Sequence, residues 1–162
     1  MMKKIILTLF VICTLTTNVH SAGSTTNSSS VTSNYDKAIK YIKSAKKLEK
    51  DGKIDKAQKK YAKAQKLLIK LYNKKSDNPD TLNYLGFTTR KLGDYENGEK
   101  YYLEGLQLDP NHIGINEYLG ELYIATDRID LANERLKVLA TCNCKEYNQL
   151  KDIIAGTRKS KY

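Results

Sequence analysis

Apolar residues recur at helical spacing along most of this chain. Between residues 36 and 157 they return at every third or fourth position, separated by Lys, Asn, Asp and Glu. This spacing gathers the apolar side chains on one face of a helix and leaves the other face polar. The pattern predicts helices over residues 36–50, 53–75, 79–92, 95–108, 113–126 and 129–141, followed by a closing helix over about 145–157.

Glycine and proline mark the ends of these helices. Gly52 and Gly93 can adopt the left-handed conformation that ends a helix. Pro79 fits the first turn of a helix, where its missing N–H costs nothing, and Pro110 stops the helix before it. A second group of glycines lies inside the predicted helices and indicates close approach between neighbouring helices, which offsets their cost. This group is Gly86, Gly98, Gly105 and Gly120.

Two stretches of the chain correspond at an offset of 34 residues. Leu85-Gly86 matches Leu119-Gly120, and Tyr95 matches Ile129. A fixed period of this size indicates a solenoid of stacked helix pairs.

A longer first copy precedes these two stretches. The turn at Gly52 resembles the turn at Gly93, but the two glycines are 41 residues apart. The seven extra residues amount to two helical turns, which preserve the direction of an apolar face. We therefore place them in the second helix of the first pair.

The repeated residues resemble the packing positions of the tetratricopeptide repeat family, over about residues 38–141. The residues that carry this resemblance are Leu85, Gly86, Gly93-Asp94-Tyr95, Gly98, Tyr102, Gly105 and Pro110. The resemblance implies an all-α fold, an α-solenoid of about three helix-turn-helix repeats within a domain spanning 36–157. The repeats are expected at about 38–78, 79–112 and 113–144, the first one extended. A capping helix over 145–157 is expected to seal the last repeat with one apolar face.

The first 21 residues have the pattern of a secretory signal peptide. A basic start, Met1 to Lys4, precedes an apolar run from Ile5 to Leu15, which is too short to span a bilayer. We expect cleavage near Ser21-Ala22 and a soluble exported protein, periplasmic or secreted; the alternative is a retained membrane anchor. Residues 22–35 are mostly Ser, Thr and Asn and are expected to form a disordered linker.

Charge is distributed unevenly. Residues 36–76 hold fifteen lysines and four acidic residues, a net charge of +11, whereas residues 77–155 hold eight basic and fourteen acidic residues, a net charge of −6. Residues 158–162 form a basic tail. Nucleic acid is not an expected partner, because the lysines surround the helices and are not gathered with stacking aromatics. The lysine-rich first repeat is either an attachment to an anionic surface of the cell envelope or a solvated face.

Cys142 and Cys144 are the only cysteines after the predicted signal peptide. Export permits a disulfide. Three interpretations stay open: a disulfide that pins the capping helix, two free or intermolecular thiols, and a redox-active pair. The stretch from Cys144 to Lys151 resembles the ending of small exported bacterial tetratricopeptide proteins, in which a paired-cysteine turn precedes a helix. Zinc is not expected, since two thiols need two further ligands and the mature chain has only His112 beside scattered carboxylates.

No catalytic constellation is present in the sequence. A glycine-rich phosphate loop is missing, and no Ser or Cys nucleophile has a base, because the mature chain contains one histidine. We expect a non-enzymatic protein with no cofactor and no small-molecule substrate.

The expected function is to bind a protein or peptide in the concave groove lined by the first helix of each repeat. The candidate binding residues are Asn83, Tyr84, Phe87, Arg90, Lys91, Glu117, Tyr118 and Glu121. Their aromatic area and hydrogen-bonding reach suit an extended peptide; alternatively, Tyr84 and Phe87 simply pack on the neighbouring helix. The first repeat is expected to add Ile42, Lys43, Lys46 and Lys50. The chaperone-tail clamp of the family is not expected, because Ile42 occupies a row where it requires Lys.

Overall fold

The computed structural model describes residues 26–74 and 77–160, with side chains from Asn34 onward. This part of the chain contains seven helices and no strand. The helices are α1 (Thr26–Lys50), α2 (Ile54–Tyr72), α3 (Pro79–Lys91), α4 (Tyr95–Leu108), α5 (Ile113–Ala125), α6 (Ile129–Leu139) and α7 (Lys145–Ile154). The all-α fold predicted from the sequence is confirmed.

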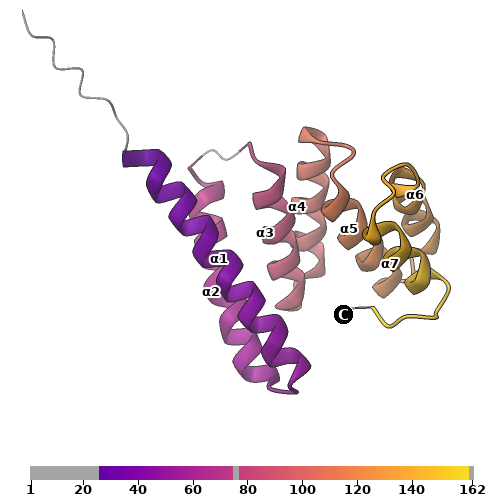
Figure 1. Ribbon diagram of the computed structural model, residues 1–162, viewed down its shortest axis with the longest axis horizontal. Coiled ribbons are helices and arrows are strands. Elements are labelled where there is room, and N and C mark those ends of the chain that lie inside the picture. The colour runs from indigo at the N-terminus through magenta and orange to yellow at the C-terminus, as the bar shows by residue number, and fades with distance from the viewer. Residues whose placement is uncertain (1–25, 75–76, 161–162) are drawn as a thin grey trace, which may run out of the picture.

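The helices form three hairpins that stack in chain order. Helix α1 pairs with α2, α3 with α4 and α5 with α6, and α7 packs against both helices of the last pair (Figure 1). This is an α-solenoid with a closing helix. The first hairpin is the longest, with helices of 25 and 19 residues against 13 and 14 in the second.

Side-chain caps and glycines set the helix boundaries. The Asn78 side chain accepts a hydrogen bond from the Asp80 N–H (2.8 Å), and Pro79 occupies the first position of α3. The Asp94 carboxylate accepts from the Asn97 N–H (3.1 Å) at the start of α4. Such caps satisfy N–H groups that have no partner inside the helix. Gly93, with a φ of 94°, makes the turn between α3 and α4, as its position in the sequence predicted.

The linker expected over residues 22–35 requires a correction. Helix α1 begins at Thr26, so residues 26–35 are helical. Further along α1, Tyr35, Ala38 and Ile42 pack against the core and hold the helix in place. Extending an existing helix is much less costly than starting one, so the polar residues upstream continue it. Residues 22–25 and the predicted signal peptide at 1–21 lie outside the described residues.

Three helices end at least two residues before the ends that their apolar patterns predicted. Helix α2 ends at Tyr72, α6 at Leu139 and α7 at Ile154. After α7, Gly156 takes a φ of 70° and turns the chain. None of the helices in the described part of the chain is both long and apolar enough to cross a membrane.

Glycines inside the helices permit the close stacking, as expected. A Cβ atom added at Gly86 of α3 would lie 2.7 Å from ring carbons of Tyr102 in α4. A Cβ atom added at Gly120 of α5 would lie 2.6 Å from a methyl carbon of Leu150 in α7. Both distances are far shorter than a carbon–carbon contact allows, so the helices approach this closely only because the side chain is missing.

Candidate binding groove

The first helices of the hairpins and the end of the chain enclose a cavity of about 900 Å³. We call this cavity the groove. Its lining comes from three places: α1, α3 and the segment after α7, which runs back toward α3 (Figure 1). The lining residues are Lys46, Glu49, Lys50, Phe87, Lys91, Lys159 and Ser160.

Two of the lining residues, Phe87 and Lys46, belong to a cluster of two aromatic rings and two cations. The Phe87 ring packs on the Tyr118 ring of α5 at a centroid distance of 5.1 Å. The Lys46 ammonium lies 4.4 Å from the Phe87 centroid and donates a hydrogen bond to the Tyr118 hydroxyl (3.1 Å). The Arg90 guanidinium lies 5.2 Å from both ring centroids. Contacts of this kind are electrostatically favourable, so the cluster joins α1, α3 and α5.

A buried ion pair lies beneath the rings. Arg90 of α3 and Glu121 of α5 are 3.5 Å apart, and both side chains are 0% exposed. Glu117, one turn earlier on α5, is also buried. Desolvation of two charges is costly, and their attraction offsets it only in close geometry. Burial and the nearby Glu117 carboxylate raise the pKa of the Tyr118 hydroxyl, which therefore stays protonated.

Glu49 connects the outer wall of the groove to the core. Its carboxylate pairs with the Lys91 ammonium and accepts a hydrogen bond from the Tyr61 hydroxyl (3.0 Å). Tyr61 in turn packs edge to face on Phe87 at 5.7 Å. Burial and the Glu49 carboxylate raise the pKa of the Tyr61 hydroxyl.

The candidate residues are less open than the sequence suggested. Six of the eight are buried: Asn83, Phe87, Arg90, Glu117, Tyr118 and Glu121. Tyr84 and Lys91 are partly exposed. Of the candidates, Phe87 and Lys91 line the groove, and Arg90, Tyr118 and Glu121 cluster with Phe87 in the interior. The ring of Tyr84 instead contacts Tyr35 of α1 (6.1 Å). The alternative interpretation was that Tyr84 and Phe87 pack on a neighbouring helix. It describes the contacts of Tyr84 with Tyr35 and of Phe87 with Tyr61.

The first repeat contributes to the groove only in part. Lys46 and Lys50 line it, but Ile42 is buried in the core. Sequence reasoning missed Glu49 and the segment at Lys159 and Ser160. Gly156 was the available signal, because a glycine directly after a helix often reverses the chain.

A second, shallower hollow of about 310 Å³ lies on the first hairpin. Its lining consists of lysine stems around two larger side chains: Lys37, Tyr41, Lys63, Lys66, Leu67 and Lys70. The Lys60 ammonium lies 5.2 Å from the Tyr41 centroid. This surface carries much of the positive charge of residues 36–76.

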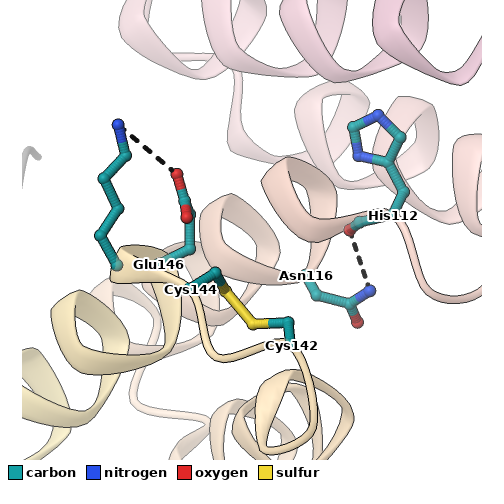
Figure 2. The surroundings of a disulfide bond; sticks show 6 residues. His112, Asn116, Cys142, Cys144 and Glu146 are labelled. Atoms are coloured by element: carbon teal, nitrogen blue, oxygen red, sulfur yellow. Dashed lines mark hydrogen bonds and ion pairs between the residues drawn. A yellow bond between two sulfur atoms is a disulfide. The ribbon is translucent and has the colours of Figure 1, made fainter.

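A disulfide joins Cys142 and Cys144 in the turn between α6 and α7 (Figure 2). Asn143, between them, has a φ of 47°, and Cys144 is the residue that precedes the first turn of α7. Glu146 lies in that first turn and pairs with Lys145 at 3.8 Å. The bond fixes the direction in which α7 leaves α6.

His112 has structural partners at the start of α5. Its Nδ1 accepts a hydrogen bond from the Ile115 N–H, and its Nε2 lies 3.1 Å from the Asp80 carboxylate. A single tautomer, with the proton on Nε2, serves both contacts. Over residues 26–74 and 77–160, no three His, Cys, Asp or Glu side chains gather as a metal site.

Comparison with known proteins gives matches among solved structures only. No protein-family profile matches the chain. No curated protein matches it either. The tetratricopeptide (TPR) domain of Arabidopsis OM64 is 13% identical, with a TM-score of 0.49, and covers 77% of this chain and 99% of its own. The first TPR domain of Spaghetti (RPAP3), bound to the HSP90 peptide SRMEEVD, is 18% identical, with a TM-score of 0.48, and covers 76% of this chain and 94% of its own.

Proposed function

We propose that this chain is a non-enzymatic scaffold that binds an extended segment of a partner protein in the groove. The observation that carries the proposal is the groove itself, a cavity of about 900 Å³ with the Phe87 ring at its wall and lysines around it. An aromatic anchor surrounded by long cationic side chains suits a peptide that combines an apolar side chain with carboxylates. The charge of the wall favours an acidic segment over a basic one.

A charge reversal at the rim of the groove tests this function. Lys50 is exposed at the end of α1 and lines the groove, whereas Lys40 is exposed on the same helix and does not. The probe is the partner segment identified by photo-crosslinking in an envelope fraction and then synthesised. Lys50→Glu should weaken binding of this peptide roughly tenfold, as expected for a like charge placed against it. Lys40→Glu should leave binding unchanged. An equal loss in both variants would argue against the groove.

A second function has support from the lysine-lined hollow on α1 and α2. In this alternative the first hairpin attaches the protein to an anionic surface of the envelope and the other hairpins act as a spacer or adaptor. Attachment of this kind weakens strongly with added salt, whereas peptide binding at the buried rings weakens little. Co-sedimentation with anionic vesicles at low and moderate salt, compared between the parent chain and Lys63→Glu/Lys66→Glu, separates the two functions.

We also propose that the protein is exported, on the strength of its first 21 residues. Amino-terminal sequencing of the mature protein should then begin near Ala22. An intact Met1 on the functional protein would contradict export by a cleaved signal.

A further inference from the structure

We infer that the carboxy-terminal segment, residues 158–160, is a displaceable wall of the groove that covers Glu121, and that a partner segment must move it before it reaches this carboxylate. This inference rests on the proposed function for the partner, but the docking of the segment does not. Figure 1 shows the chain after α7 running back toward the earlier hairpins, and Lys159 and Ser160 line the cavity.

The turn after α7 directs the segment toward the groove. The N–H groups of Thr157 and Arg158 both donate to the Asp152 carbonyl, at 3.0 and 3.2 Å. The Thr157 hydroxyl donates to the same carbonyl at 3.0 Å. Together with the left-handed Gly156, these bonds reverse the chain at the end of the helix. The direction of the segment is therefore fixed by its own backbone and not only by the contacts at its end.

The segment ends on a buried carboxylate. The Ser160 hydroxyl donates to Glu121 Oε2 at 3.4 Å, across 39 residues of sequence. Glu121 and Arg90, which would be the accessible polar groups of an open groove, have no exposed side-chain surface.

Two properties make the segment displaceable. Its hydrogen bond to Glu121 is long, and its two basic side chains are exposed, so each contact is weak. The tether is short, however, and a tethered ligand acts at an effective concentration of about millimolar. The segment therefore covers Glu121 most of the time without being held there permanently. An external segment binds with an affinity reduced by the fraction of open groove.

The occupied site has a chemical preference of its own. Glu121 accepts a hydrogen bond from the Ser160 hydroxyl. A partner segment that takes over this position should carry a hydroxyl or a cation at one end. Its carboxylates would lie at the other end, near Lys46 and Lys50.

The test supplies the segment in trans. A chain that ends at Thr157 keeps the helix-ending turn but lacks residues 158–162. This shortened chain and the full-length mature chain are titrated in parallel with a synthetic acetylated peptide of residues 158–162. Backbone amide chemical shifts are recorded in both titrations. We expect saturable shifts in the shortened chain at α3 and α5, around Phe87 and Glu121. The full-length chain should show none at the same peptide concentrations, because its site is occupied.

Matched controls keep the result interpretable. A peptide with Ala in place of Ser160 should bind roughly 2- to 10-fold more weakly, the effect expected of one hydrogen bond as long as this one. If the shortened chain does not fold, the full-length Ser160→Ala chain takes its place and should accept the peptide. Equal shifts in the parent and opened chains, or shifts away from α3 and α5, would overturn the inference.

The same chains distinguish this inference from the proposed function. If the tail peptide binds the shortened chain but the crosslinked partner peptide binds both chains equally, the segment covers Glu121 and the partner does not displace it. The proposed function fails separately, if Lys50→Glu leaves binding of the partner peptide unchanged. Tighter partner binding by the shortened chain supports both.

Discussion

Two oppositely charged side chains beside the groove form an ion pair that is buried away from water. Arg90 and Glu121 belong to different hairpins, and both side chains are fully buried next to each other. The sequence identified both residues as candidates but assigned them to an open surface. Their burial depends on α1, on the stacking of α3 against α5 and on the returning segment, and residue type and spacing contain none of this information.

Neutralising one member of this pair should destabilise the protein. We expect Glu121→Gln to lower the free energy of unfolding by about 3 kcal/mol, because it leaves the Arg90 guanidinium buried beside a neutral group. Urea unfolding followed by circular dichroism measures this change. Arg90→Met combined with Glu121→Leu should recover much of the loss, since a buried pair can be replaced by apolar groups of similar volume.

An exposed pair supplies the control. Glu96 and Lys100 are both largely exposed on α4. Glu96→Gln should have little effect on the urea midpoint. If Glu121→Gln changes the midpoint as little as Glu96→Gln does, the buried pair has no structural role.

At the level of elements, the junction between the last hairpin and α7 depends on one missing side chain. Leu150 of α7 lies where a side chain on Gly120 of α5 would be. The sequence predicted the two parts of this contact separately, a glycine inside a helix, where it is unfavourable, and a closing helix with one apolar face, but not that the two meet. Most helix boundaries were also predictable from the sequence, because caps and turns depend on residues that are close in sequence. The start of α1 was not, since there a helix continues through residues that would not start one.

Gly120→Ala should destabilise the protein although alanine favours helices. Alanine is better than glycine in a helix interior by about 1 kcal/mol, but here its Cβ atom overlaps Leu150 and pushes α7 away. We expect a lower thermal midpoint and faster amide exchange in α7. In a Leu150→Ala background, the same change should be neutral or stabilising. A higher midpoint for Gly120→Ala alone would contradict the close packing of α5 and α7.

For the whole molecule, tyrosines contribute a large share of the core. The chain has twelve tyrosines and no tryptophan, and Tyr61, Tyr102 and Tyr118 are buried. Burial raises the pKa of each of these hydroxyls above the ordinary value of 10.0. The unfolded chain therefore loses these protons at a lower pH than the folded chain does.

The stability of the protein should consequently fall at alkaline pH. A group whose pKa is raised by folding stabilises the folded state fully below its unfolded pKa, and this contribution is lost as the pH rises beyond it. The urea midpoint should be nearly constant as the pH approaches 10.0 from below and should fall above that value. Tyr102→Phe, which removes one buried hydroxyl, should reduce the steepness of the fall. A midpoint independent of pH in the alkaline range would show that these hydroxyls ionise normally.

The stacking of each hairpin on its neighbours also has a consequence for how the chain reaches its structure. Almost every helix packs against helices next to it in sequence, so contacts form without closing long loops, and folding can start in any hairpin and spread to the next. The bond from Ser160 to Glu121 depends on α5, α6 and α7 already being in place. The returning segment is therefore expected to dock last in folding and to be released first in unfolding.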